Sequence, residues 1–473
     1  MATNIPRAYG HELVEFHERF APVFGRREAR SHSLVYMKGL IMGDKMRKSV
    51  EPLALQFSQA SDGSPAGQNE VLALQEFLTS SPWDYLDVQR EVQATFVEKL
   101  GHSTSEWPLG VVGIIDESSF VKKGTESCGV KRQWCGRLGK KENCQVGVFL
   151  VGVTPAGSAL LDHQLYLPQE WAADRVRRQK TRVPQVIKFQ TKPEIAASLI
   201  QRTLDAGMLQ LDWITVDELY GRDGNFLDAL EARGLRYVAE VPVTTTVRLS
   251  GAASDTTVGD DQSLRSLELS QAFAMQVSAV ARELPPDAWH PYQLREGAKG
   301  PLVFEFAFVR VWATRHGKTG DPQWLIVRRS MAAEPEYKYY VSNADGSTPT
   351  QHLALVTGTR WRVEEFFEDG KGDFGMADYE ARAWTSWHHH MSLVAMAHLF
   401  VTVNRYQLKQ DVPDITLPMA IRLLQAALQR PTLTEEEAIR LTEYHLRRNR
   451  IARESHRKSW MQRHKNVKPK RLL

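Results

Sequence analysis

The sequence contains very little cysteine and lacks a long apolar run. Its three cysteines, Cys128, Cys135 and Cys144, are too few and too irregularly spaced for a zinc site. The longest apolar run, Met391 to Val403, is too short to cross a bilayer, which takes about 20 residues. The start, MATNIPRAYGHELVEF, contains acids and lacks the apolar core of a signal peptide. We therefore expect reduced thiols and a cytoplasmic protein without membrane segments.

Positive and negative charges nearly balance over the 473 residues, but they are unevenly distributed. The net charge is +4, whereas residues 447–473 contain eleven lysines and arginines against one acid, Glu454. This tail therefore carries +10, and the other 446 residues sum to −6. Such a tail is either a solubilising, disordered end or a nucleic-acid contact, and Trp460 among the basic residues favours the second. The candidate DNA contacts are Arg447, Arg448, Arg450, Lys468 and Lys470.

The length and the 42% share of hydrophobic residues predict two or three domains. Residues 1–105 are predicted to be helical, because HELVEFHERFAPVFG has apolar residues at helical spacing and LVYMKGLIMG is typical of a buried helix. Basic residues make this region a probable DNA-binding domain, although they are also common on solvated helix faces. They are Arg26, Arg27, Arg30, Lys45, Arg47 and Lys48.

Residues 106–243 have the pattern of strands and helices that alternate. The apolar run PLGVVGIIDESSF contains Asp116 at its end and leads into a basic turn with Lys122 and Lys123. QVGVFLVGVTP and GSALLDHQLYLP complete a group of three strands, and LDWITVDELYG is a later strand that ends at Asp217. A strand end holds a carboxylate rigidly where it meets solvent, which suits a metal ligand. Alternatively, each acid caps the turn that follows.

Residues 244–343 are predicted to be a β-rich insertion, because LVFEFAFVRVWATRH, PQWLIVRRS and EYKYYVSNA alternate or run apolar at strand lengths. Residues 344–410 would belong to the same domain as residues 106–243. Residues 411–473 would form a helical C-terminal region with the basic tail. The run His388, His389 and His390 invites a metal assignment. Consecutive helical residues point in different directions, so packing or capping is the better interpretation.

Residues 359–375, TRWRVEEFFEDGKGDFG, predict a helix with mixed charges on one face. At 100° per residue, the stripe contains Arg360, Glu364, Glu368 and Lys371, with Trp361 and Phe367 at its edges. A solvated helix with i,i+4 ion pairs is the alternative, but the aromatic residues count against it. Glycines end the helix at its basic end, where an anionic ligand can approach. The stripe therefore suits a carboxylate beside phosphates.

Arg360, Glu364 and Lys371, with Trp361 after the arginine, resemble the Tyr-Arg-Glu-Lys signature of DDE transposases from bacterial insertion sequences. The words DESSFVKKG, QLYLPQEWAAD and RWRVEEFFEDGKG are similar to one subfamily of these DDE superfamily endonucleases. The sequence departs from the signature at Thr357, where the family usually has tyrosine. The resemblance implies a mixed α+β fold, with an RNase H-like core of order β-β-β-α-β-α-β then α, the β-rich insertion, and a helical N-terminal domain.

The resemblance also implies the chemistry. Asp116, Asp217 and Glu364 would be catalytic and would hold two Mg²⁺ ions, with Mn²⁺ as a substitute, because hard cations prefer carboxylate oxygens. Arg360 and Lys371 would position phosphates. Further DNA contacts are expected at Trp361, Lys122 and Lys123. The implied partner is double-stranded DNA, at the element's ends and at the target, bound by a dimer or higher oligomer associated with the bacterial nucleoid.

The expected function is therefore DNA transposition. The alternatives are a structure-selective endonuclease with the same acids and a domesticated DNA-binding protein that does not cut. Three glutamates neighbour the three acids but are expected to face elsewhere: Glu117, Glu218 and Glu365. They are therefore expected to be internal controls when the three acids are substituted. In the insertion, at most one of Trp289, Trp312 and Trp324 is expected to hold an unstacked base, since most tryptophans in β domains are core residues.

Overall fold

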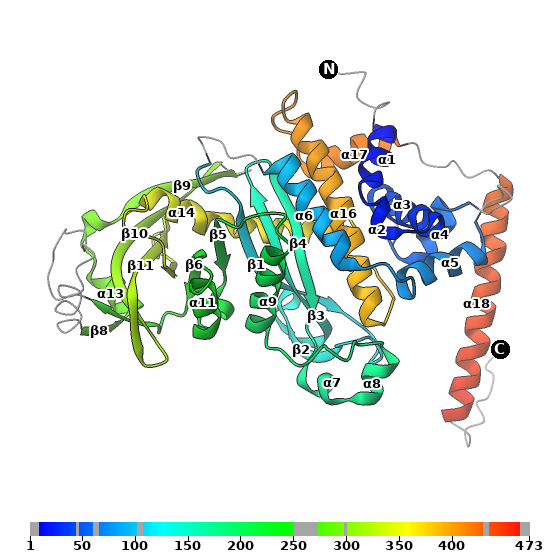
Figure 1. Ribbon diagram of the computed structural model, residues 1–473. Coiled ribbons are helices and arrows are strands. Elements are labelled where there is room, and N and C mark those ends of the chain that lie inside the picture. Colours follow the sequence, from blue (N-terminus) through cyan, green and yellow to red (C-terminus); the bar gives the residue numbers. More distant parts are fainter. Residues whose placement is uncertain are drawn as a thin grey trace.

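A computed structural model describes residues 9–43, 47–59, 66–101, 107–249, 273–297, 300–428 and 435–463. The fold is mixed α+β, as predicted, with one large sheet flanked by helices (Figure 1). None of the helices in these ranges is long and apolar enough to cross a membrane. The three cysteines are buried free thiols.

In the described part of the chain before β1 (Val112–Val121), the structure has six helices, in a region where the apolar spacing predicts helices. They are α1 (Tyr9–Glu18), α2 (Ala21–Phe24), α3 (Arg27–Met42), α4 (Val50–Phe57), α5 (Gln68–Thr79) and α6 (Tyr85–Leu100). Helices α3, α5 and α6 pack against the long helix α16 (Trp384–Leu408), and the ring of Phe16 in α1 lies 5.3 Å from the ring of Phe400 in α16. The Tyr36 hydroxyl and His390 Nδ1 lie 2.8 Å apart. The N-terminal helices therefore share a continuous core with the rest of the molecule.

The twelve described strands form a single sheet of order β2-β3-β1-β5-β6-β12-β11-β10-β7-β8, with β4 paired to β3 and β9 to β10. The first group is β1 (Val112–Val121), β2 (Lys131–Cys135), β3 (Lys140–Thr154), β4 (Gly157–Leu165), β5 (Trp213–Val216) and β6 (Arg236–Val241). Strands β1, β5 and β6 run parallel, whereas β1 and β3 are antiparallel. Strand β2 was not expected, because its sequence had the pattern of a basic turn.

Short helices connect these strands. They are η1 (Gly136–Leu138), α7 (Gln169–Ala173), α8 (Arg175–Lys180), α9 (Lys192–Asp205), α10 (Glu218–Gly221) and α11 (Gly224–Glu231). Helix α9 begins with a capping box, in which Thr191 and Glu194 satisfy each other's backbone amides. Its apolar face, including Leu199, packs on the sheet. Crossover helices of this kind are what parallel neighbours such as β1 and β5 require.

The predicted insertion is β-rich, and its strands continue the same sheet. They are β7 (Thr246–Leu249), β8 (Phe273–Gln276), β9 (His290–Gly297), β10 (Gly300–Arg315), β11 (Lys318–Ser330) and β12 (Tyr337–Ser342), with α13 (Val277–Glu283) and η2 (Pro286–Ala288) between them. Antiparallel pairing of β12 with β6 joins this part to the parallel strands. The insertion is therefore attached through backbone hydrogen bonds and not through loops alone.

The remaining helices are α14 (Thr350–Thr359), α15 (Trp361–Gly372), α16, α17 (Leu417–Ala427) and α18 (Glu435–Arg463). Helix α16 lies between the N-terminal helices and strand β4 (Figure 1), and its apolar residues on all sides are buried. His388, His389 and His390 are buried there and contact backbone carbonyl oxygens, so their interpretation as packing residues is confirmed. Helix α18 runs along the outside of the molecule.

Candidate active site

Two of the predicted acids lie at the same level of neighbouring parallel strands. Ile115 of β1 pairs with Val216 of β5, and the next residue along each strand is Asp116 or Asp217. Asp116 Oδ1 accepts a hydrogen bond from the Glu117 amide at 2.7 Å, while Asp217 Oδ1 caps α10 by accepting one from the Leu219 amide at 2.9 Å. The turn-capping alternative therefore holds for Asp217. It does not exclude a second role, since each carboxylate has another oxygen.

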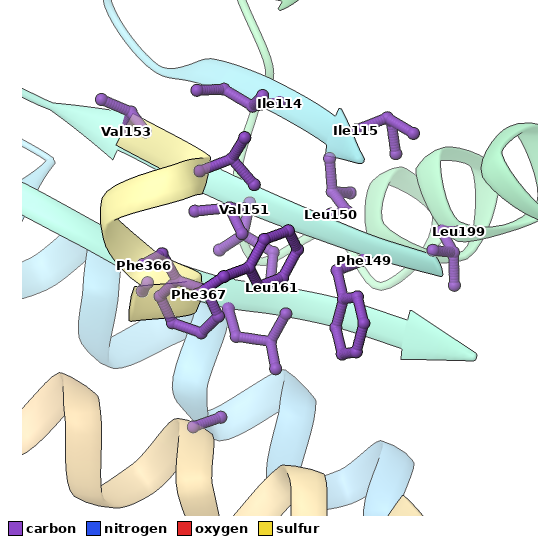
Figure 2. Close-up of a cluster of buried hydrophobic side chains, with 14 of the residues drawn as sticks. Ile114, Ile115, Phe149, Leu150, Val151, Val153, Leu161, Leu199, Phe366 and Phe367 are labelled. Carbon is purple, nitrogen blue, oxygen red and sulfur yellow. The ribbon is translucent and has the colours of Figure 1, made fainter. Parts of the chain in front are cut away.

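Helix α15 brings a cation to these acids. Arg360, directly before the helix, places Nη1 3.2 Å from Asp116 Oδ2 and Nη2 3.3 Å from Glu364 Oε1. Phe367 anchors the helix against the strands, as Figure 2 shows, with its ring 5.3 Å from the ring of Phe149, while the ring of Phe366 lies 4.7 Å from that of His398 in α16. Three of the residues singled out in the sequence are thus linked by one guanidinium group.

The electrostatic environment of Asp116 is unfavourable for its charge. Burial, together with the charges of Asp217 and Glu117, raises the pKa of Asp116 to about 7, against the lowering effect of Arg360. The pKa of Asp217 is also raised, first by burial and then by Glu117. A single arginine therefore undercompensates the negative charge of this cluster, and strongly perturbed acids of this kind are typical of functional sites.

Two further acids belong to this cluster, although sequence reasoning did not place them there. Val216 pairs with Ala239 of β6, so Glu240 follows at the same level as Asp217. Its Oε2 lies 3.9 Å from Arg360 Nε, and its Oε1 accepts a hydrogen bond from Lys338 at 2.9 Å. The signal lies in the segment LRYVAEVPV, whose apolar pattern is typical of a strand and which contains this acid.

Glu117 is the second unexpected acid, and its charge makes it a less suitable internal control than its direction on the strand predicts. Lys192 Nζ donates to Glu117 Oε1 at 2.5 Å, and the Tyr220 hydroxyl donates to Oε2 at 2.9 Å. Although Glu117 faces away from Arg360, its charge raises the pKa values of both Asp116 and Asp217. Glu365, by contrast, pairs with Arg362 at 3.1 Å and remains a suitable control.

The donor set fits a hard divalent cation in its chemistry. Asp116 and Asp217 offer carboxylate oxygens whose mutual repulsion a cation would relieve. Glu364 would be the third ligand, but its side chain is 62% exposed and turned toward Arg360. Within the described ranges, no three His, Cys, Asp or Glu side chains gather closely enough to hold a metal ion. A complete ligand set would thus require Arg360 and Glu364 to change their contacts.

The three lysines near the acids that were predicted to contact DNA, Lys371, Lys122 and Lys123, differ in their surroundings. Lys371 Nζ donates to Ser118 Oγ at 2.7 Å, and burial, followed by the charge of Arg137, lowers the pKa of Lys371 to about 8. Lys122 Nζ donates to the Tyr379 carbonyl at 3.0 Å, and burial lowers its pKa to about 8. Lys123 is exposed. Only Lys123 is therefore freely available to a ligand without a change of contacts.

Of the tryptophans predicted to contact DNA or a base, two are partly exposed and two are buried. Trp361 is half-buried and stacks on the guanidinium of Arg295, 3.8 Å from the ring centre. Trp289 and Trp312 are 8% and 4% exposed, as expected of core residues. Trp324 is partly exposed and donates to the Asp345 carbonyl at 3.1 Å. Of the three insertion tryptophans, Trp324 is thus the most exposed, and the guanidinium of Arg310 lies over its ring, 4.9 Å from the ring centre.

The basic tail is helical as far as Arg463. Arg447, Arg448 and Arg450 are exposed on α18, and Arg448 pairs with Glu51 at 3.0 Å. Lys468 and Lys470 lie outside the described residues. The exposed part of the tail presents cations to solvent, as a nucleic-acid contact requires.

Comparison with known proteins assigns a class to this acid-rich site. The chain belongs to the family described as DDE superfamily endonuclease, which its residues 19–301 match. Over 182 residues it is also 34% identical to a protein of Microchaete diplosiphon described as a probable transposase for insertion sequence element IS701. That match covers 37% of this chain and 42% of the relative, less than half of either. The family match includes Asp116 and Asp217, whereas Glu364 lies beyond it.

Proposed function

We propose that the protein is a DNA transposase. It binds the ends of an insertion sequence, cleaves phosphodiester bonds there and joins the freed 3′-hydroxyl ends to target DNA. The observation that carries the proposal is the placement of Asp116 and Asp217 at one level of parallel strands, with Arg360 linking Asp116 to Glu364. The family match and the transposase relative support it.

The proposal includes an RNase H-like catalytic core. The parallel pairing of β1 with β5 and β6, and the antiparallel pairing of β1 with β3, support it. We also propose the predicted division into a helical DNA-binding part (1–105), a core in two parts (106–243 and 344–410), an insertion (244–343) and a C-terminal region (411–473). The shared hydrophobic core implies that these parts are firmly docked against one another.

Asp116, Asp217 and Glu364 are proposed to hold divalent cations, with Mg²⁺ preferred. When bound, such ions stabilise the charge on the attacking and leaving oxygens of an in-line phosphoryl transfer. The chain's own residues prepare the site. Asp116 must lose its proton before its Oδ2 can act as a ligand, and Arg360 must release that oxygen. The freed guanidinium, with its planar fork of donors, suits a DNA phosphate beside the acids.

Binding and cutting can be separated experimentally. The purified full-length protein would be incubated with a labelled duplex carrying the element's terminal sequence, a target plasmid and Mg²⁺. We expect nicking at the terminus and labelled strands joined covalently to the plasmid. Nicking without joining would show that the protein is an endonuclease and not a transposase. Specific binding without either reaction, in Mg²⁺ and in Mn²⁺, would identify a domesticated DNA-binding protein.

A further inference from the structure

The hairpin formed by β2, η1 and the start of β3, residues 131–141, combines an exposed aromatic ring with a local excess of positive charge. We call it the basic hairpin. It contains five lysines and arginines and no acid. Two of these cations have partners, since Lys131 pairs with Glu170 and Lys140 with Glu142. The other three form no ion pair with any residue in the described ranges: Arg132, Arg137 and Lys141.

Trp134 of this hairpin is 57% exposed, far more than the other tryptophans whose side chains are described. The ring contacts no other aromatic group and no cation among the described residues. Exposing a large apolar ring to water is unfavourable, so an unpartnered tryptophan of this kind is typical of a binding surface. Sequence reasoning sought a stacking residue in the insertion, where Trp289 and Trp312 are instead buried.

The register of the hairpin gathers the ring and two of the cations on one face. Trp134 pairs directly with Lys141, and Arg132 precedes it by two residues on the same strand. Side chains two apart, and those directly opposite in an antiparallel pair, share a face. On the other face Cys135 packs with Cys144 and Val146, which anchors the strand. Gly139, with a φ of +60°, allows the tight turn between η1 and β3.

The hairpin lies beside the candidate active site. Its η1 segment contacts β1, the strand that carries Asp116. The charge of Arg137 lowers the pKa of Lys371, the lysine bonded to Ser118 on that strand. Along β3, Lys141 is eight residues from Phe149, the partner of Asp116, which is about 26 Å for a fully extended strand. A DNA strand held at the acids can therefore reach the hairpin within several nucleotides.

We propose that the basic hairpin binds an unpaired stretch of a DNA strand, with a base stacked on Trp134 and phosphates held by the three unpartnered cations. Stacking on one aromatic ring tolerates any sequence, because every base has a flat π face. Paired bases are covered by their neighbours in the duplex, so the ring selects an unpaired segment. The inference rests on the proposed function, which supplies strands separated by cleavage. A second copy of the chain is a poorer partner, because two such cationic hairpins repel each other.

The test compares two DNA probes of equal length and arbitrary sequence, one fully paired and one with a single-stranded overhang. Binding to the full-length protein would be measured by fluorescence anisotropy for wild type, Trp134→Ala, Trp134→Phe and Leu138→Ala. We expect Trp134→Ala to weaken overhang binding about tenfold and duplex binding less than twofold. Trp134→Phe should retain most of the affinity. Leu138→Ala, which trims another exposed side chain of the hairpin, is the matched control.

A triple variant, Arg132→Gln, Arg137→Gln and Lys141→Gln, should reduce the slope of log K against log salt for the overhang probe by about 2, since each phosphate contact to a single strand contributes about 0.7. Unchanged overhang binding in Trp134→Ala would overturn the inference. So would a changed oligomeric state with unchanged binding, which would make the surface a protein interface. The Asp116→Asn variant separates the two proposals: if it cuts normally, the proposed active site is wrong whatever the hairpin binds.

Discussion

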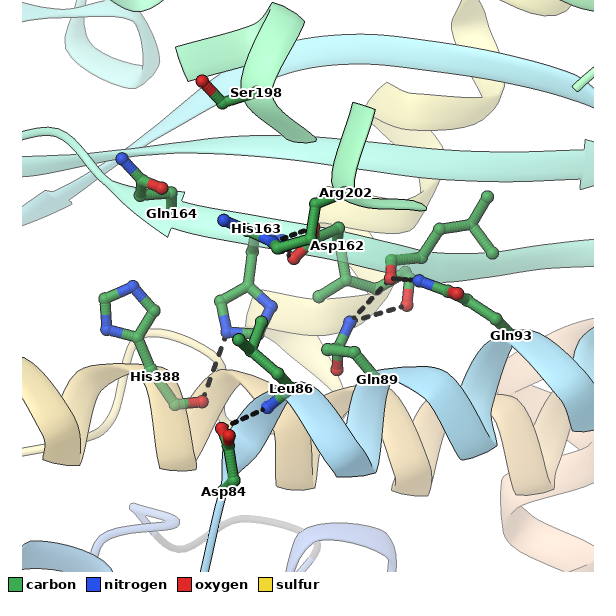
Figure 3. A network of polar contacts seen from close by, with 12 residues as sticks. Asp84, Leu86, Gln89, Gln93, Asp162, His163, Gln164, Ser198, Arg202 and His388 are labelled. Carbon is green, nitrogen blue, oxygen red and sulfur yellow. Dashed lines mark hydrogen bonds and ion pairs between the residues drawn. The ribbon is translucent and has the colours of Figure 1, made fainter. Parts of the chain in front are cut away.

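Two buried aspartate–arginine pairs in this molecule have the same chemistry and different surroundings. Arg202 of α9 holds Asp162 of β4 through both oxygens, at 2.8 and 2.9 Å (Figure 3), and the Asp162 side chain is 1% exposed. Arg360 holds Asp116 through one contact of 3.2 Å and reaches toward Glu240 and Glu364 as well. The first arginine serves one carboxylate, whereas the second is shared among several.

The difference shows how to separate a structural ion pair from a functional one. Asp162 sits in a polar network in which Gln89 and Gln93 donate to the carbonyl of Leu161, and its own contacts are complete. Asp116 has two more acids nearby that raise its pKa, and one partly shared cation. Surplus negative charge that the protein leaves uncompensated is a place where a cation can bind. We therefore expect the first pair to determine stability and the second to determine catalysis.

The largest expected effect is on cleavage. Asp116→Asn, Asp217→Asn and Glu364→Gln should each slow strand cleavage about 10³-fold or more, because an amide keeps the shape but loses the charge that a divalent cation requires. Binding to terminal DNA should change little. A gel assay for nicking and an anisotropy titration measure the two properties. Glu365→Gln is the control and should cut normally. If Glu365→Gln fails to cut while Glu364→Gln cuts, Glu364 is not the catalytic glutamate of this helix.

Next in size is the loss of stability when the structural pair is broken. Arg202→Gln should lower the free energy of unfolding by about 3 to 5 kcal/mol near pH 7, because it leaves Asp162 charged and buried without a partner. The loss should shrink in acid, where Asp162 takes up a proton. Arg360→Gln should cost less stability, since Asp116 is more exposed, at 15% against 1%. Urea unfolding of both variants decides this, and equal losses would remove the distinction between the pairs.

A smaller effect with the opposite sign is expected at Asp116. Its pKa is about 7 in the folded chain against 3.8 for the ordinary carboxyl, so the folded state binds more protons between these values and stability falls as the pH rises through them. In protein freed of metal by EDTA, Asp116→Asn should therefore be more stable than wild type at pH 8 by roughly 2 to 4 kcal/mol. The gain should vanish near pH 4. If Asp116→Asn is instead less stable than wild type at pH 8, the Arg360–Asp116 pair contributes to stability in the way that the Arg202–Asp162 pair does.

The smallest effect is expected from the basic tail, whose described cations Arg447, Arg448 and Arg450 are exposed. Deleting residues 447–473 should weaken DNA binding with little dependence on sequence. If about half of its eleven cations reach phosphates, the slope of log K against log salt should flatten by roughly 4 to 5. Replacing Arg447, Arg450 and Arg453 by glutamine keeps the helix and should give a proportionate part of that change. A salt series on terminal and random duplexes measures the slope for the deletion and for the triple variant. An unchanged slope would show that the tail does not contact DNA.

Several features could be predicted because they depend on neighbours in the chain. The helical pattern of the first hundred residues, the strands that carry or precede Asp116 and Asp217, and the helix α15 with Glu364, which Arg360 directly precedes, follow from periodicity and local chemistry. The break between α14 and α15 and the short strand β2 were missed, because neither has a distinct apolar repeat. Glu117 was misjudged, since alternation along a strand gives the direction of a side chain and not its electrostatic reach.

The sequence by itself determined which residues can carry charge to a strand end or a helix face, because these placements need only a period of two or 3.6 residues. Only the tertiary structure decided which of them meet. The register of three parallel strands puts Asp116, Asp217 and Glu240 in one row, and packing of Phe367 on Phe149 brings Arg360 to them across 244 residues of chain. Burial likewise decided which tryptophans are core and left Trp134 exposed. Contacts between distant segments depend on the whole packed core, which no local pattern encodes.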